Sequence, residues 1–192
     1  MSKLAALLLA GGASVRMGRQ KASLDFGGTP LWRHQLDTLM KLEPDELYIS
    51  GSPALDLPSG PWKILYDEQP GLGPLSGLTT ALHASTATQL VVLAVDLPNV
   101  TPEFLQLLLA QADPDGGIVP ELDAFYQGTV AVYPRRLLPA CEQILGSHDR
   151  SFQRLVRQGL VEKSLKVYPV GEAERPLFLN LNTPEDFPVK EG

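Results

Sequence analysis

The chain has 192 residues, 44% of them hydrophobic, with a formal net charge of −6 and a single cysteine. This length predicts one domain over residues 1–192, and the apolar fraction excludes wholesale disorder. The lone Cys141 excludes an internal disulfide framework and favours a cytoplasmic location. The negative charge excludes nucleic acid as a general partner, and the apolar stretches are too short for a membrane partner.

In chain order, short apolar runs alternate with helical patterns, which is typical of an α/β fold. The first run is apolar at consecutive positions, so it predicts a strand buried on both faces of a parallel sheet. In the first half, strands are predicted at 3–9, 46–50, 63–66 and 90–95, and helices from Pro30 and through Leu75, Leu78 and Leu82.

The second half is less regular. Thr101 and Pro102 combine a capping residue with a proline at the first helical position, which predicts a helix start. Further strands are predicted at 129–133 and 165–170, and further helices at 137–145 and 151–158.

The most informative segment is the glycine-rich loop at 9–21, which follows the first predicted strand and carries Arg16, Arg19 and Lys21. Glycines let a backbone approach a ligand and aim amide N–H groups at phosphate oxygens, while the cations meet the remaining charge. The spacing matches neither the Walker loop nor the dinucleotide loop. An ordinary strand-to-helix turn with solvated cations stays open as the alternative.

Two aspartates end predicted strands, Asp67 and Asp96. A carboxylate at a strand end can hold Mg²⁺, a hard cation that binds one or two carboxylates together with substrate phosphates and waters. Asp96 also precedes Pro98 and Asn99, so plain turn chemistry is the alternative. A second glycine-rich turn, at 71–78, leads into a helix and offers backbone groups and a helix N-terminus to a ligand, although a simple helix cap has the same pattern.

The loop resembles the Leu-Ala-Gly-Gly-x-x-x-Arg-Met-Gly-x-x-Lys signature of the nucleotidyltransferases related to MobA, the molybdenum cofactor guanylyltransferase family. The resemblance implies that Lys21 contacts the phosphates of a nucleotide and that Arg16 contacts the leaving pyrophosphate. It also implies nucleotide contacts by Leu9, Ala10, Gly11 and Gly12.

Other motifs of this family follow in the same order along the chain. The Val95-Asp96-Leu97-Pro98 segment resembles a Cys-Asp-x-Pro motif, with valine in place of cysteine, which implies that Asp96 binds Mg²⁺ and nucleotide. The resemblance further implies nucleotide contacts by Asp67 and by the Gly-Pro-Leu-x-Gly element, that is, by Gly73, Pro74, Leu75 and Gly77. Ser50 stands where many relatives have asparagine, and it is kept as a candidate contact.

Near the end, residues 180–186 resemble an Asn-x-Asn-Thr-Pro-Glu-Asp element of the guanylyltransferases, which favours guanine over cytosine transfer. Side chains of a strand alternate between its two faces, so Asn180 and Asn182 would point to the same side. There their amides can hydrogen-bond an anionic acceptor substrate, a pterin or its phosphate. Capping of a following helix is the alternative. The 148–151 segment also resembles a family segment near the acceptor, which implies a phosphate contact by Arg150.

Together these features predict a three-layer α/β/α domain with a Rossmann-like, mainly parallel mixed sheet. The resemblance implies transfer of GMP from Mg²⁺-GTP to the molybdenum-molybdopterin cofactor, with Arg16, Lys21 and Asp96 as catalytic residues. GTP and molybdopterin are then the substrates, and molybdoenzyme apoproteins or their chaperones are the candidate recipients. A cytidylyltransferase, a sugar-phosphate nucleotidyltransferase and a catalytically silent nucleotide-binding module stay open.

Overall fold

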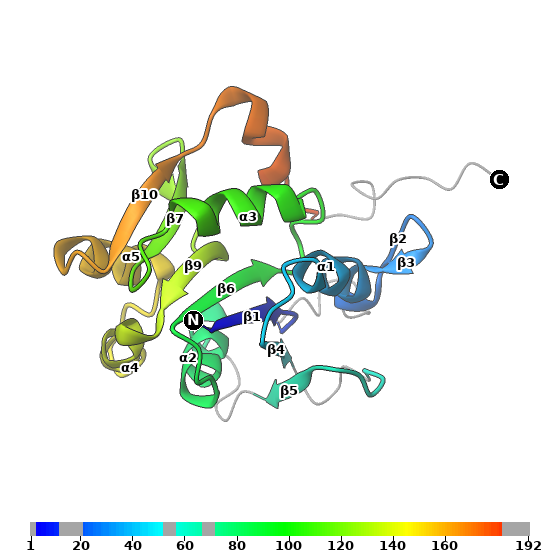
Figure 1. The fold of residues 1–192 in the computed structure, drawn as a ribbon, viewed down its shortest axis with the longest axis horizontal. Coiled ribbons are helices and arrows are strands. Elements are labelled where there is room, and N and C mark those ends of the chain that lie inside the picture. The colour runs from blue at the N-terminus through cyan, green and yellow to red at the C-terminus, as the bar shows by residue number, and fades with distance from the viewer. Residues whose placement is uncertain (1–2, 12–20, 52–56, 67–71, 182–192) are drawn as a thin grey trace.

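The structure, a computed structural model, describes residues 3–11, 21–51, 57–66 and 72–181. Figure 1 shows their fold, with a central sheet in the order β10-β7-β9-β6-β1-β4-β5 and β8 beside β7. The strands are β1 (Leu4–Leu9), β2 (Asp25–Phe26), β3 (Thr29–Pro30), β4 (Glu46–Gly51), β5 (Lys63–Tyr66), β6 (Gln89–Ala94), β7 (Gly117–Leu122), β8 (Phe125–Tyr126), β9 (Val130–Pro134) and β10 (Leu165–Pro169). The helices are α1 (Leu31–Met40), α2 (Pro74–Ala84), α3 (Pro102–Gln111), α4 (Leu138–Leu145) and α5 (Phe152–Val161), with short 3-10 helices at Lys21–Ser23, Arg135–Leu137 and Glu172–Phe178.

The sheet is mixed and mainly parallel, as predicted. β1 runs parallel to both of its neighbours, β4 and β6, and β5 and β10 also run parallel to their partners β4 and β7. Only β9, between β6 and β7, and the short β8 introduce antiparallel pairs in the described part of this sheet. The carboxyl ends of β1, β4 and β6 therefore meet at one edge.

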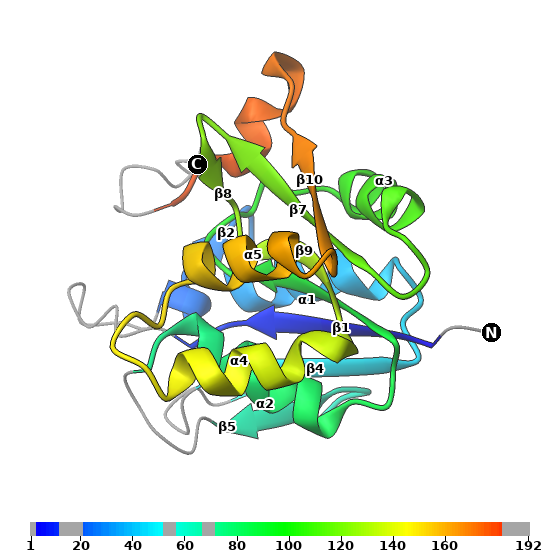
Figure 2. The ribbon, with the colours of Figure 1, turned by 90° about the vertical axis from the view of Figure 1, so that its left-hand side faces the viewer.

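Helices cover both faces of the sheet, which confirms the predicted three layers. α1 and α3 lie on one face, and α2, α4 and α5 lie on the other (Figures 1 and 2). Each face buries its own apolar cluster, and β1 contributes to both because its side chains alternate. Positions 5–9 are all buried, as the uninterrupted apolar run predicted.

Thr101 caps its helix as predicted, and a second predicted helix has a cap that was not predicted. The Thr101 side chain accepts a hydrogen bond from the Phe104 amide, and the Ser151 side chain accepts one from the Arg154 amide. None of the helices in the described ranges has the length and apolar character needed to span a membrane.

Several elements differ from the prediction. A small hairpin, β2–β3, was not predicted and lies after the glycine-rich loop. Its turn uses Gly27 and Gly28 at positive φ. β7 was not predicted, because Pro120 lies inside it and proline normally argues against a strand within a sheet. The predicted strand at Asn180 is wrong: a 3-10 helix over Glu172–Phe178 precedes it, and residues 179–181 have no strand structure.

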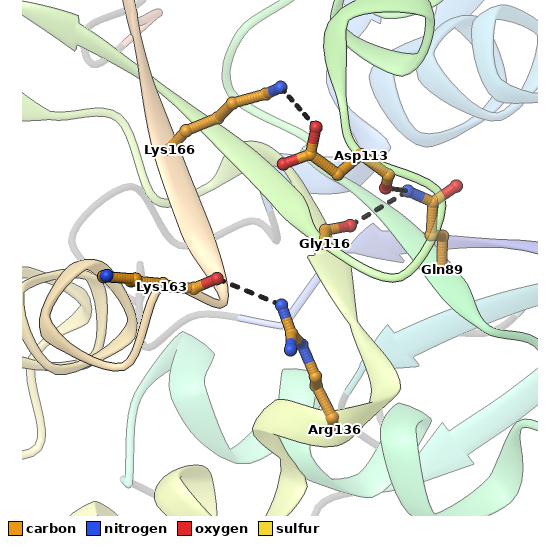
Figure 3. Close-up of polar contacts among 6 residues, drawn as sticks. All are labelled: Gln89, Asp113, Gly116, Arg136, Lys163 and Lys166. Carbon is orange, nitrogen blue, oxygen red and sulfur yellow. Dashed lines mark hydrogen bonds and ion pairs between the residues drawn. The ribbon is translucent and has the colours of Figure 1, made fainter.

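Polar contacts fasten the loops at the opposite, amino-terminal edge of the sheet. The side-chain amide of Gln89, at the start of β6, donates to the carbonyl oxygens of Asp113 and Gly116, both at 2.9 Å. Figure 3 shows this double contact together with the 2.8 Å ion pair between Lys166 and Asp113. The Arg136 guanidinium donates to the Lys163 carbonyl, 3.1 Å away. These contacts lie at the edge of the sheet opposite to the carboxyl end of β6.

Cys141 is a packing residue. It is fully buried between α2, α4 and the sheet. Burial is the main cause that raises the pKa of its thiol, to about 12. A thiol of this kind is protonated at neutral pH and is a poor nucleophile.

Candidate active site

The candidate site begins at the edge where β1, β4 and β6 end side by side. The last residue of β1, Leu9, is in register with Ser50 of β4 and with Ala94 of β6. The segments that follow these positions are those in which the sequence predicts ligand contacts. Ligands of open α/β sheets bind beyond the carboxyl ends of the strands, so this edge is the expected place for a site.

Lys21 and Asp96 form an ion pair at this edge. The Lys21 ammonium nitrogen lies 3.4 Å from Asp96 Oδ2, although the residues are 75 positions apart in sequence. Lys21 begins the 3-10 helix over 21–23, and Asp96 lies in the turn after β6. The Lys21 side chain is 14% exposed and the Asp96 side chain 33% exposed. The structure thus brings together the cation and the carboxylate that the sequence predicted for phosphate and for metal.

Burial of its neighbours holds Asp96 at the edge. Val95 and Leu97 are both buried, so Asp96 is the partly exposed residue between two core residues. Val95, which stands where the motif has cysteine, is 7% exposed and packs in the core. The Val95 amide also donates to the Leu9 carbonyl, 3.1 Å away, which ties the turn to β1.

The donor chemistry of this edge fits Mg²⁺. One accessible carboxylate is a usual protein contribution to the binding of this ion, which takes its other ligands from phosphates and water. Within the described ranges, no group of three or more histidine, cysteine, aspartate or glutamate side chains is arranged to hold a metal. A closed, all-protein metal cage is therefore not present in that part of the chain.

The backbone after β1 folds onto the end of β4. The amides of Ala10 and Gly11 both donate to the Ser50 carbonyl, at 2.8 and 3.0 Å. Gly11 is exposed, and a Cβ built on it would lie 3.4 Å from the Gly51 Cα. These two amides are thus engaged within the protein, so they are not the N–H groups aimed at phosphate that the sequence predicted.

The start of α2 forms the second part of the edge. Gly73 has a φ of 77°, a conformation that favours glycine, and together with Pro74 it is exposed at the helix start. Leu75 is fully buried. Gly77 packs so closely on Ser50 that an added Cβ would lie 2.4 Å from Ser50 Oγ. Burial gives Leu75, Gly77 and Ser50 packing contacts here, and their nucleotide contacts stay predictions.

The predicted acceptor residues lie in two separate segments. Asn180 is exposed, and its neighbour Leu181 donates its amide to the Asp96 carbonyl, 3.0 Å away, which joins this segment to the metal-binding candidate. Arg150 is exposed in the loop between α4 and α5. That loop lies at the same end of the molecule as the carboxyl end of β1 (Figure 2). Its Nε donates to the carbonyls of Leu145 and Ser147.

A groove of about 500 Å³ lies between α2 and the end of α4. Its lining includes hydroxyl groups from one face of α2, and it consists of Leu72, Ser76, Thr79, Thr80, His83, Leu145 and Gly146. Arg150 is bonded to the carbonyl of one lining residue, Leu145. This bond places Arg150 next to the groove lining.

Four predicted site residues lie outside the described residues: Gly12, Arg16, Asp67 and Asn182. Their roles stay predictions.

Sequence reasoning missed Gln35 and the neighbouring His34. Gln35 is fully buried and donates to the carbonyls of Ala94 and Leu97, on either side of Asp96. His34 is partly buried, with Nε2 2.9 Å from the Pro98 carbonyl. A signal for Gln35 existed, because this polar residue shares the apolar face of α1 with Leu31 and Leu39.

Known proteins match this chain over most of its length. Residues 6–164 match the model of the MobA-like NTP transferase domain. The chain is 34% identical over 189 residues to a protein of Opitutus terrae named "probable molybdenum cofactor guanylyltransferase", covering 96% of this chain and 93% of that one. A protein of the same name from Pelotomaculum thermopropionicum is 30% identical over 190 residues, covering 97% and 91%.

Solved structures share the fold. The molybdopterin-guanine dinucleotide biosynthesis protein A of Archaeoglobus fulgidus superposes with a TM-score of 0.71 at 24% identity, over 95% of this chain and 94% of that one. The 2-C-methyl-D-erythritol 4-phosphate cytidylyltransferase of Thermus thermophilus has a TM-score of 0.69 at 19% identity, over 94% and 93%. With a matching family model over most of its length and relatives at 30–34% identity, this chain belongs to the MobA-like NTP transferase family.

Proposed function

We propose that this protein transfers GMP from GTP to the terminal phosphate of molybdopterin carrying molybdenum, and releases pyrophosphate. The observation that carries the proposal is the meeting of Lys21 and Asp96, with 3.4 Å between ammonium and carboxylate, at the edge where β1 and β6 end. Relatives that match nearly the whole chain carry the name of this activity. Nucleotidyl transfer needs positioned charge more than a protein nucleophile, and this pair supplies both signs of charge.

In the proposed reaction, a phosphate oxygen of the acceptor attacks the α-phosphorus of GTP. The bond from the α-phosphorus to the bridging oxygen breaks, and that oxygen leaves with pyrophosphate. Lys21 binds the phosphates and stabilises the negative charge that develops on the leaving group, together with Arg16. No covalent intermediate with the protein is needed.

Asp96 is the residue that would hold Mg²⁺ and nucleotide, and Asp67 would contact the nucleotide. The ion supplies charge neutralisation at the triphosphate when it is bound. Asp96 suits the role because its carboxylate is partly exposed while its neighbours are anchored in the core. Lys21 exchanges its contact with Asp96 for contacts with phosphate when nucleotide binds.

The nucleotide and the acceptor would occupy neighbouring regions of the same edge. Leu9, Ala10, Gly11 and Gly12, the turn at Gly73 and Pro74, and the adjoining Ser50, Leu75 and Gly77 are proposed to surround the nucleotide. Asn180 and Asn182 would bind the acceptor from the segment bonded to Asp96, and Arg150 would bind it from beside the α2–α4 groove. A cytoplasmic location and delivery of the product to molybdoenzyme apoproteins or their chaperones belong to the same proposal.

Pyrophosphate release with each of the four nucleoside triphosphates, Mg²⁺ and molybdopterin carrying molybdenum tests the proposal. Release with GTP, and little with CTP, supports guanylyl transfer. Release with CTP or only with a sugar phosphate as acceptor would assign the protein to one of the two alternative transferases. GTP binding without pyrophosphate release would leave a nucleotide-binding module.

A further inference from the structure

The turn that carries Asp96 is attached to α1 by hydrogen bonds from the side chain of one residue, Gln35. Its side-chain nitrogen donates to the Ala94 carbonyl at 3.1 Å and to the Leu97 carbonyl at 2.6 Å. These carbonyls belong to residues two positions before and one position after Asp96. The two N–H groups of a single amide thus bracket the predicted metal ligand.

The burial of Gln35 makes this attachment costly to replace. Gln35 has no exposed surface, and its carbonyl oxygen Oε1 is buried without a hydrogen-bond partner. A buried amide without partners is strongly unfavourable, and a rotated amide would set its oxygen against two carbonyl oxygens. The side chain is therefore fixed in the orientation that donates to Ala94 and Leu97, at the expense of its own oxygen.

A second contact from the same helix supports the same turn. His34 Nε2 lies 2.9 Å from the Pro98 carbonyl, and its ring packs against Phe26 of the β2–β3 hairpin, with 5.0 Å between ring centroids. The Pro98 contact lies just beyond the two that Gln35 makes. Side chains of helix α1 thus contact three backbone carbonyl groups in and beside the turn.

We propose that Gln35 is a positioning residue, which sets the direction of the Asp96 carboxylate and so the affinity of the site for metal-bound nucleotide. This inference rests on the proposed function. Gln35 itself is buried in the core and acts through the backbone of the turn. Residues that orient a metal ligand without touching the metal commonly change metal affinity by about 10- to 100-fold when they are replaced.

The amide group is what the position requires. Methionine has a similar length and shape but no donor, so Gln35→Met would keep much of the packing and leave two buried carbonyls without their partner. The turn would then relax away from α1, and the Asp96 carboxylate would move with it.

Gln89 provides a matched control on β6, the strand that leads into the turn with Asp96. Its side-chain amide also donates to two carbonyl oxygens, those of Asp113 and Gly116, but at the amino-terminal end of β6 (Figure 3). Gln89→Met removes the same chemical group and the same number of hydrogen bonds. A change found in Gln35→Met and absent from Gln89→Met is therefore due to the place of Gln35.

The test is the dissociation constant of GTP measured by calorimetry, with saturating Mg²⁺ and with EDTA, in the full chain and at a temperature where each variant is folded. We expect Gln35→Met to weaken binding of Mg²⁺-GTP by about tenfold or more, and to change metal-free GTP binding much less. Gln89→Met should bind both forms as the wild type does.

The outcomes separate this inference from the function on which it rests. If wild-type binding of GTP does not depend on Mg²⁺, or if Asp96→Asn leaves that dependence unchanged, the proposed metal role of Asp96 fails. If that role holds but Gln35→Met binds Mg²⁺-GTP as Gln89→Met does, the inference about Gln35 is wrong.

A milder variant covers the case in which Gln35→Met does not fold. His34→Ala removes the third contact of α1 with the turn and leaves one carbonyl without its partner instead of two. It should weaken Mg²⁺-GTP binding in the same direction by a smaller factor, and an affinity equal to that of the wild type would overturn the inference.

Discussion

The Lys21 ammonium lies 3.4 Å from the Asp96 carboxylate, so the predicted phosphate-binding cation and the predicted metal ligand contact each other across the carboxyl-terminal edge of the sheet. The attraction between the opposite charges keeps both side chains near the place where a triphosphate would bind. Each partner has a different role in the proposed reaction, so replacing them one at a time gives different results.

Asp96→Asn should abolish Mg²⁺-dependent turnover and leave the fold intact. The pair is partly exposed, so its loss should change the free energy of unfolding by less than about 1 kcal/mol. The same variant should bind GTP more tightly than the wild type in EDTA, because the carboxylate no longer competes with phosphate for Lys21. Activity assays, denaturation and calorimetry check these points, and wild-type turnover would remove the metal role.

Lys21→Ala should weaken GTP binding by about 10- to 100-fold, as expected for loss of a charge-assisted hydrogen bond worth about 1.5–3 kcal/mol. Lys166→Ala is the control, because Lys166 also pairs with an aspartate, Asp113, but at the opposite edge. Calorimetric titration with GTP compares the two. Equal affinities in both variants would contradict the phosphate role of Lys21.

Gly77→Ala should destabilise the protein. Alanine normally stabilises a helix relative to glycine, but a Cβ here would lie 2.4 Å from Ser50 Oγ and 2.9 Å from a methyl carbon of Leu9. Overpacking of this kind costs about 1–3 kcal/mol, so it outweighs the helix preference.

Gly146→Ala is the control for Gly77→Ala. Gly146 has a φ of −73°, and the nearest atom to an added Cβ is 3.6 Å away. Urea denaturation should show lower stability for Gly77→Ala and equal or higher stability for Gly146→Ala. A stabilised Gly77→Ala would show that the close contact between α2 and β4 is absent.

Glu46 should make the stability depend on pH in acid. Burial alone would raise the pKa of its carboxyl group, but hydrogen bonds from Ser85, Thr86 and Tyr48 lower it from 4.5 to about 2. Because the folded pKa is depressed, the stabilisation is fully present above about pH 4.5 and is lost as the pH falls toward 2.

With its partial exposure allowed for, the contribution of Glu46 is on the order of 2 kcal/mol. Glu46→Gln should therefore lower the free energy of unfolding at neutral pH and flatten its fall between pH 4.5 and 2. Thermal denaturation over this range checks the prediction. A variant whose stability falls as steeply as that of the wild type would show that other carboxylates dominate.

The sequence predicted most of the first half of the fold, because its signals are local. The apolar run before Leu9 depends on neighbours in the chain, and so does the cap at Thr101 in the second half. β7 could not be predicted in this way, because Pro120 argues against a strand, while the partners that form the strand, β10 and β9, lie elsewhere in the chain. Asn180 was assigned to a strand from alternation alone, which carries no information on the preceding 3-10 helix.

The candidate site shows the same limit. Lys21 and Asp96 were predicted separately from motifs, and their 3.4 Å contact follows from the pairing of β1 with β6. Gln35 was missed because its partners, the carbonyls of Ala94 and Leu97, are backbone groups about 60 residues away, which leave no mark in a sequence pattern. A polar residue on an apolar helix face is the one local sign of such a contact.

The most direct test of the central claim uses GTP labelled at its α-phosphate and measures transfer of the label into the cofactor. With Mg²⁺ and molybdopterin carrying molybdenum, the wild-type protein should move the label into a pterin dinucleotide and release unlabelled pyrophosphate in equal amount, and Asp96→Asn should do neither. Label that stays in GTP or appears as free GMP, or equal transfer by Asp96→Asn, would contradict the account.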